Sequence, residues 1–201
     1  MGVDKSKLGL VHVITGDGSG KTRSALGLAL RAMGHGLRVY MVQFMKLGYT
    51  GEILHLIQLS EKMETVPFEI QPFSVKCKND KDHQRLIRLG LFEGYCRDCF
   101  APNPFDSEKA EEAFETAKRA AESGRFDIVV MDEINVVVSK GLLPVQKVLS
   151  LIQSKAPNCE LVLTGRDAPP ELVEAADYVS EVRKVKHPYD KKIYARKGIE
   201  F

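Results

Sequence analysis

A glycine-rich loop that ends in lysine and threonine is the first feature of this chain able to do chemistry. It reads Gly16-Asp17-Gly18-Ser19-Gly20-Lys21-Thr22. Glycines let backbone N–H groups approach phosphate oxygens, and the lysine adds a positive charge. Thr22 opens a predicted helix, where its hydroxyl can reach Mg²⁺ beside the positive helix end. The loop therefore predicts nucleoside triphosphate binding, although it is one residue shorter than the usual pattern, whose first glycine would fall at Thr15.

Two carboxylates follow a second apolar run and suit the same ligand. Asp132 and Glu133 come directly after residues 128–131, which is where the acidic partner of a phosphate loop is expected. One of the pair can hold Mg²⁺ directly or through water, and the alternative is a solvated strand end. Arg166 follows another apolar run and either steadies phosphate or pairs with Asp167.

A metal site of a different kind is suggested by the cysteines. Cys96 and Cys99 form a C-x-x-C with Cys77 and His83 nearby, which could hold a structural Zn²⁺. The second half-site is incomplete, so free thiols are the alternative. His12 lies within an apolar run and is interpreted as a hydrogen-bonded core residue, not a catalyst.

Strands that alternate with helices must position these residues. We expect one domain over 1–201, with an irregular, cysteine-containing excursion at about 76–104. Such alternation predicts an α/β fold: an open, mostly parallel sheet with helices on both faces, of P-loop NTPase (RecA-like) architecture. The expected strands are 8–14, 38–44, 68–72, 128–131, 160–163 and 178–182. The expected helices are 21–33, 52–63, 82–93, 144–155 and 170–176. A further helix is expected to begin at Ser107 and to end at Gly124.

Composition limits the classes of partner. The chain has 201 residues, with 29 Lys and Arg against 27 Asp and Glu, which argues against a whole-chain field for nucleic acid or a membrane surface. The polar start, with neither a secretory signal nor a spanning segment, leads us to expect a cytoplasmic protein. Residues 183–197 are locally basic and contain Tyr189 and Tyr194. This run is interpreted as a solvated tail, a wall for an anionic small molecule, or a nucleic-acid arm.

Several motifs together resemble one family, the ATP:corrinoid adenosyltransferases of the phosphate-loop type. The resemblance covers about the first fifty residues and residues 126–201. Its motifs are the shortened loop, Arg31-Ala32-Met33-Gly34-His35-Gly36, Val42-Gln43-Phe44, Met131-Asp132-Glu133, Leu163-Thr164-Gly165-Arg166, Asp177-Tyr178-Val179-Ser180-Glu181-Val182-Arg183 and Val185-Lys186-His187.

The resemblance implies that a Co(I) corrinoid attacks the 5′ carbon of ATP and releases triphosphate. It implies that ATP is bound by residues Gly16 to Arg23 of the loop and by Arg31 of the first helix. Thr22 and Glu133 would hold Mg²⁺, with Asp132 as the less certain ligand. Lys21 and Glu133 would be catalytic.

The resemblance also implies partners and leaves one site open. It implies a corrinoid substrate such as cobalamin or cobyrinic acid a,c-diamide, a reductant such as a flavoprotein, and a homodimer. The aromatic segment that family members place over the corrinoid is not recognisable, so no residue is assigned to the corrinoid. Phe73 and Phe92 are only candidates.

Two other functions fit the phosphate loop. A small-molecule kinase of the nucleoside type combines such a loop with a cysteine-rich zinc segment, and it would produce ADP instead of triphosphate. A nucleotide-gated binding module for nucleic acid or a partner protein is the second, although the even charge balance weighs against it.

Overall fold

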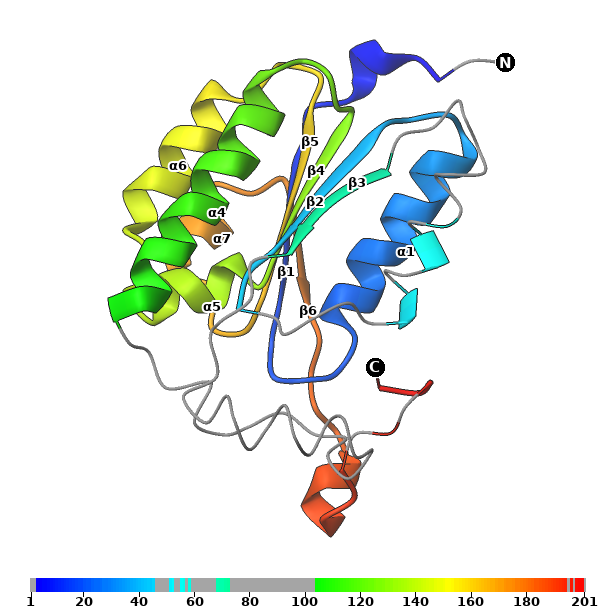
Figure 1. The fold of residues 1–201 in the computed structure, drawn as a ribbon, viewed down its shortest axis with the longest axis vertical. Coiled ribbons are helices and arrows are strands. Elements are labelled where there is room, and N and C mark those ends of the chain that lie inside the picture. The colour runs from blue at the N-terminus through cyan, green and yellow to red at the C-terminus, as the bar shows by residue number, and fades with distance from the viewer. Residues whose placement is uncertain are drawn as a thin grey trace.

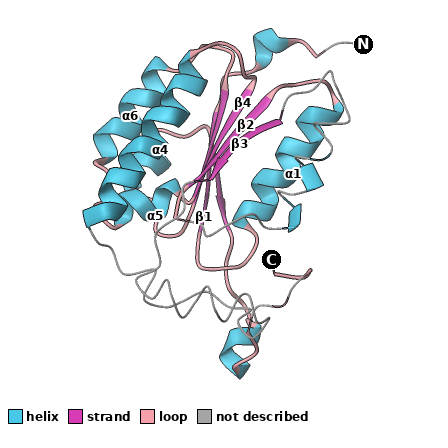
Figure 2. Cartoon of the chain, viewed as in Figure 1, coloured by secondary structure: helices cyan, strands magenta, loops and turns pink. Residues whose placement is uncertain are grey.

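Six parallel strands form one open sheet in the computed structural model, which describes residues 3–45, 51–52, 55–56, 58, 68–72, 104–194, 196 and 198–200 (Figures 1 and 2). The strand order is β3-β2-β4-β5-β1-β6. In that order the strands are Phe68–Pro72, Val39–Gln43, Ile128–Asp132, Glu160–Thr164, Val11–Thr15 and Tyr178–Glu181. The open parallel sheet predicted from the sequence is confirmed.

Helices cover both faces of the sheet, as predicted (Figure 1). Helix α1 (Lys21–Gly34) lies on one face, together with helical residues at 51–52, 55–56 and 58. The other face carries α4 (Pro104–Glu122), α5 (Ile134–Ser139), α6 (Val145–Ser154) and α7 (Pro170–Glu174). Two short 3₁₀ helices, η1 (Lys5–Lys7) and η3 (Pro188–Lys191), lie beyond opposite ends of the strands. In the described part of the chain, no helix has the length and apolar character needed to cross a bilayer.

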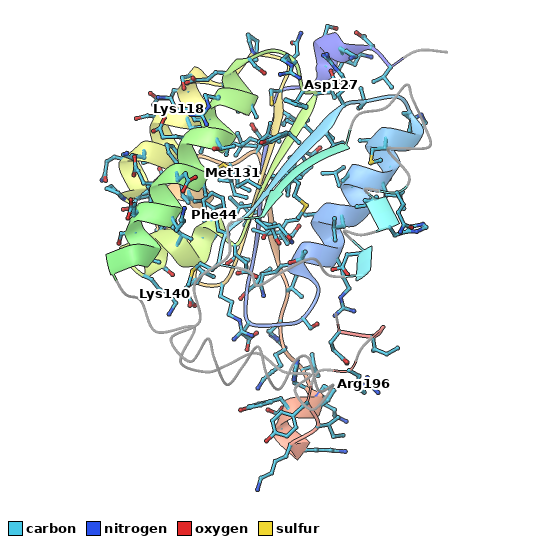
Figure 3. All side chains as sticks on the ribbon, in the orientation of Figure 1. Phe44, Lys118, Asp127, Met131, Lys140 and Arg196 are labelled. Carbon is cyan, nitrogen blue, oxygen red and sulfur yellow. The ribbon has the colours of Figure 1, made fainter. Side chains whose placement is uncertain are left out.

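Between their polar end residues the central strands are apolar, because both of their faces are covered. Every residue of β4 and β5 is buried, as expected of parallel strands between two helical layers. Phe44 and Met131 belong to the core half that faces α4 to α7 (Figure 3). Met41 and Val130 belong to the half that faces α1. Burying side chains of this size stabilises the fold by roughly 1.5–3 kcal/mol each.

The register brings the carboxyl ends of four strands to one edge. Ile14 of β1 pairs with Thr164 of β5, and Gln43 of β2 pairs with Asp132 of β4. Strand β5 therefore separates the strand that feeds the phosphate loop from the strand that carries Asp132. A side chain at the end of β5 is placed to connect the two.

Some boundaries differ from the sequence-based expectation. Helix α4 begins at Pro104 instead of Ser107, because proline is well suited to the first turn of a helix. The short helix α5 was not expected; its valine-rich sequence has weak helix propensity, and the left-handed backbone at Glu133 (φ 69°) turns the chain into it. The helix expected at 82–93 lies outside the described residues.

Candidate functional site

The phosphate loop joins β1 to α1 and holds its lysine close. Gly20, with φ 136°, is the residue before the first turn of α1. Lys21 is buried, and its Nζ donates to the carbonyl oxygens of Gly16 (2.7 Å) and Gly18 (2.8 Å). Burial lowers the pKa of Lys21, while the nearby carboxylate of Glu133 acts in the opposite direction. The loop thus presents a cation at the N-terminus of a helix, where phosphate binds best.

Two loop glycines make room for the backbone that follows β6. The Gly18 N–H donates to the Val182 carbonyl oxygen at 2.6 Å. A Cβ atom at Gly16 or Gly18 would lie 2.5 or 2.6 Å from that same oxygen. These glycines therefore allow the Val182 backbone to approach the phosphate loop closely. This contact could not be predicted from the sequence, because the two segments lie at opposite ends of the chain.

Asp132 is the centre of a buried hydrogen-bond network. Its side chain is fully buried at the end of β4. Asp132 Oδ1 accepts from Thr22 Oγ1 (2.9 Å) and from Thr164 Oγ1 (2.7 Å), and Oδ2 accepts from Gln43 Nε2 (3.2 Å). Side chains from β2, β5 and α1 thus converge on one carboxylate, which a buried charge requires.

Glu133 reaches the same edge through a different geometry. Its backbone is left-handed, and its N–H donates to Thr164 Oγ1 at 3.0 Å. Its carboxylate is near enough to Lys21 to act on the pKa of that residue. The Thr22 hydroxyl donates to Asp132, whereas the family resemblance pairs Thr22 first with Glu133.

Gln43 and Thr164 are the site residues that sequence reasoning did not assign. Both are fully buried, and each follows an apolar run at the carboxyl end of its strand. A polar residue at the carboxyl end of such a run was the available signal. The Gln43 Oε1 atom is buried and has no hydrogen-bond partner among the described residues. Such an atom costs about 1–3 kcal/mol, which calls for a compensating role.

The turn after β5 carries an arginine toward the loop. Gly165 has φ 136° and Asp167 has φ 53°, and a Cβ atom at Gly165 would lie 2.9 Å from the Val136 N atom. Arg166, between them, is exposed and close enough to Lys21 to lower its pKa. Within the described ranges no ion pair joins Arg166 to Asp167. The strained turn thus places a guanidinium beside the phosphate loop.

Asp17 ties the loop to the segment after β6. Its Oδ1 accepts from the Lys184 N–H at 2.8 Å, and this bond lowers the pKa of Asp17. Arg23 donates to Ser19 Oγ across the first turn of α1. The two charged residues at the ends of the loop are therefore held by neighbours, which fixes the shape of the loop.

Other predicted residues lie elsewhere. Arg31 is in the last turn of α1, roughly 15 Å along the helix axis from Lys21 at 1.5 Å per residue, so the structure does not bring it to the loop. His12 is hydrogen-bonded to Glu160 (2.7 Å) and stacked on Tyr178, which confirms a hydrogen-bonded structural residue. The metal and aromatic candidates outside the described residues are Cys77, His83, Cys96, Cys99, Phe73 and Phe92.

The site has the donor set that Mg²⁺ prefers. Oxygen atoms of Thr22 and Asp132 lie 2.9 Å apart at the N-terminus of α1, and hard cations bound with phosphate take hydroxyl and carboxylate oxygens. Among the described residues, no group of three or more His, Cys, Asp or Glu could hold a metal ion. A cation here would therefore need ligand oxygens from phosphate or water as well, which is how Mg²⁺ binds with nucleotides.

Comparison with known proteins gives a consistent result. Residues 7–201 match the family model described as ATP:corrinoid adenosyltransferase BtuR/CobO/CobP. A corrinoid adenosyltransferase of Pseudomonas aeruginosa is 33% identical over 198 residues, which cover 98% of this chain and 86% of the relative. One of Sinorhizobium sp is 30% identical, covering 100% and 84%, and one of Escherichia coli K12 is 29% identical, covering 96% and 86%.

Proposed function

This chain belongs to the ATP:corrinoid adenosyltransferase family, and we propose that it moves the 5′-deoxyadenosyl group of ATP to the Co(I) of a corrinoid and releases triphosphate. The adenosyl transfer to a corrinoid follows from the family. The use of Co(I), the leaving group and the roles of individual residues are our proposal.

The observation that carries the proposal is the way the loop concentrates positive charge where a triphosphate would lie. Lys21, the N-terminus of α1 and Arg166 all act at this one place. Charge that develops on a leaving group is stabilised best by fixed donors and cations of this kind. An anionic leaving group is therefore what this edge of the sheet is suited to bind.

Two groups elsewhere in the chain that could act as a base or a nucleophile, His12 and Cys159, have structural roles. His12 is paired with Glu160 toward the opposite end of the sheet, and burial raises the pKa of the Cys159 thiol to about 11. In our proposal the substrate itself supplies the nucleophile. The cobalt lone pair forms the bond to the 5′ carbon, the carbon–oxygen bond breaks, and its electron pair leaves with triphosphate. Cobalt passes formally from Co(I) to Co(III), so no protein base is needed.

The protein then contributes position and charge. Lys21 neutralises the departing triphosphate, and the loop N–H groups orient it. Thr22 and Asp132, with Glu133 beside them, would hold Mg²⁺, which supplies further neutralisation of phosphate charge. Gln43 and Thr164 keep the Asp132 carboxylate in place.

Three further elements of the proposal rest on the chemistry and the family resemblance. Co(I) must be supplied by a reductant outside this chain, such as a flavoprotein. A homodimer is proposed by resemblance. Cys77, Cys96 and Cys99 remain candidates for a structural Zn²⁺ site, which metal analysis of protein purified without chelators would test.

The direct test is anaerobic turnover with ATP, Mg²⁺ and chemically reduced cobalamin or cobyrinic acid a,c-diamide, followed by the spectrum of the alkylated corrinoid. We expect turnover by the native chain and loss of both ATP binding and turnover in Lys21→Ala. Lys7→Ala is the matched control, because Lys7 is an exposed lysine in η1, beyond the opposite end of the strands. An active Lys21→Ala variant would remove the loop from the mechanism, and a native chain that forms no cobalt–carbon bond would refute the proposal.

A further inference from the structure

The segment that follows β6 leaves the phosphate loop and returns to it. This C-terminal arm, residues 183–200, extends beyond the carboxyl ends of the strands and includes η3 (Figure 1). Near its start, the Lys184 N–H donates to Asp17 of the loop. Near its end, the pKa of Glu200 is lowered chiefly by its hydrogen bonds from Arg196 and to a smaller extent by Arg23 of α1, which is therefore nearby. Both ends of the arm therefore lie on the side of the molecule that carries the phosphate loop, where Arg196 is labelled (Figure 3).

The arm exposes large apolar side chains that a solvated tail does not need. Val185 is 80% exposed and Tyr194 is 70% exposed, and Tyr189 and Ile193 are each 47% exposed. The Tyr189 and Tyr194 rings meet edge to face with centroids 6.2 Å apart. Exposed apolar groups of this size, with two of the rings in contact, are typical of an interaction surface.

The same arm carries an excess of positive charge that its own acids do not balance. It has seven Lys and Arg and two Asp and Glu. Both acids are already used, since Asp190 pairs with Lys184 at 3.2 Å and Glu200 pairs with Arg196 at 2.9 Å. In the described part of the arm, the cations without an ion-pair partner are Arg183, Lys186, Lys191 and Lys192.

We propose that the exposed aromatic and cationic residues of the C-terminal arm bind the corrinoid substrate, and that they favour a corrinoid whose rim bears carboxylates over a fully amidated one. The inference rests on the proposed function. A corrinoid is a flat macrocycle with largely apolar faces and a rim of side chains that end in amides or carboxylates. Tyrosine rings suit its faces, and lysines suit a carboxylate rim. The arm is also placed where a corrinoid must lie, next to the bound nucleotide that it attacks.

The test compares two pairs of substitutions with matched controls. Tyr189→Ala with Tyr194→Ala removes the aromatic pair, and the control is Leu30→Ala, a 53% exposed apolar residue on α1. Lys191→Gln with Lys192→Gln removes two unpaired cations, and the control is Lys7→Gln. Each protein is assayed with ATP and two probes, cobyrinic acid a,c-diamide as the carboxylate-bearing corrinoid and cobalamin as the amidated one. Binding of each oxidised corrinoid is measured separately by equilibrium dialysis.

Substitution of both tyrosines should raise the KM for each corrinoid about tenfold, because part of each ring is buried in the complex. The dissociation constants from dialysis should rise by the same factor. Substitution of both lysines should raise the KM for the carboxylate-bearing corrinoid about fivefold and should raise the KM for the amidated corrinoid less. The KM for the carboxylate-bearing corrinoid should also depend less on salt concentration than it does in the native chain. The KM for ATP and the behaviour of both controls should not change.

The inference is overturned if the native chain adenosylates both corrinoids and the variants retain its KM values. It is also overturned if the variants raise the KM for ATP instead, because the arm would then bind the triphosphate. A third contrary result is salt-sensitive binding of a single-stranded oligonucleotide that the substitutions weaken while corrinoid binding is unaffected. A native chain that adenosylates neither corrinoid refutes the proposed function itself, which separates the two failures.

Discussion

Gly18→Ala should destabilise the chain by forcing the phosphate loop away from the segment after β6. The new Cβ atom would lie 2.6 Å from the Val182 carbonyl oxygen and 2.8 Å from the Arg183 carbonyl carbon. Both are backbone atoms, so no side-chain rotation relieves the contact. Gly18 does not have a left-handed backbone, so the effect is steric and does not include a φ penalty.

The magnitude follows from two terms. Overpacking of this kind costs about 1–3 kcal/mol, and the loss of the Gly18 N–H bond to Val182 costs about 1 kcal/mol more. We therefore expect the free energy of unfolding to fall by about 2–4 kcal/mol. Asp17 should also lose its bond from Lys184, because the same backbone shift separates them.

Urea denaturation followed by circular dichroism measures the change, with calorimetric titration of ATP as a second readout. Gly27→Ala is the matched control, since nothing lies within 4 Å of its new Cβ atom and the residue is in α1. That control should stabilise the chain by roughly 0.5–1 kcal/mol. If Gly18→Ala is as stable as its control and binds ATP as the native chain does, the packing of Val182 against the loop is refuted.

Three further predictions concern buried polar groups. Gln43→Met removes the donor to Asp132 Oδ2. The Mg²⁺ concentration needed for half-maximal ATP binding should therefore rise about tenfold in a calorimetric titration. An unchanged concentration would contradict the role of Gln43 in positioning the Asp132 carboxylate. Burial acts to raise the pKa of Asp127, but the bond from the Arg38 N–H and its ion pairs outweigh that effect and lower it. Its contribution to stability should be present above about pH 4 and lost as the pH falls further, so Asp127→Asn should be less stable than the native chain at pH 7 and approach it at pH 3 in denaturation curves. The Cys159 thiol, with its pKa raised to about 11, should resist maleimide at pH 8 until the chain unfolds, as measured by peptide mapping; rapid labelling of the folded chain would contradict this.

The sequence was sufficient for features that depend on local pattern. Continuous apolar runs predicted β4 and β5 because strands buried on both faces need no polar alternation. The loop residues and the good helix formers after Lys21 predicted α1 in the same way. These features follow from residues that are neighbours in the chain.

The remaining features depend on contacts between distant segments. Nothing near Gly18 indicates that Val182 packs on it, and nothing near Gln43 indicates that its amide donates to Asp132. Helix α5 was not predicted, because valines favour strands; it begins after the left-handed turn at Glu133 and packs against β5. The position of Arg31 shows the converse, since a motif matched in sequence lies at the far end of α1 from the loop.

The identity of the phosphate product shows which bond of ATP breaks. ³¹P NMR of an anaerobic reaction with ATP, Mg²⁺ and reduced corrinoid should show intact triphosphate, formed in equal amount to the cobalt–carbon bond seen in the visible spectrum. Formation of ADP with a phosphorylated acceptor, or of ADP and phosphate without alkylated corrinoid, would refute adenosyl transfer and place the broken bond at phosphorus instead of the 5′ carbon.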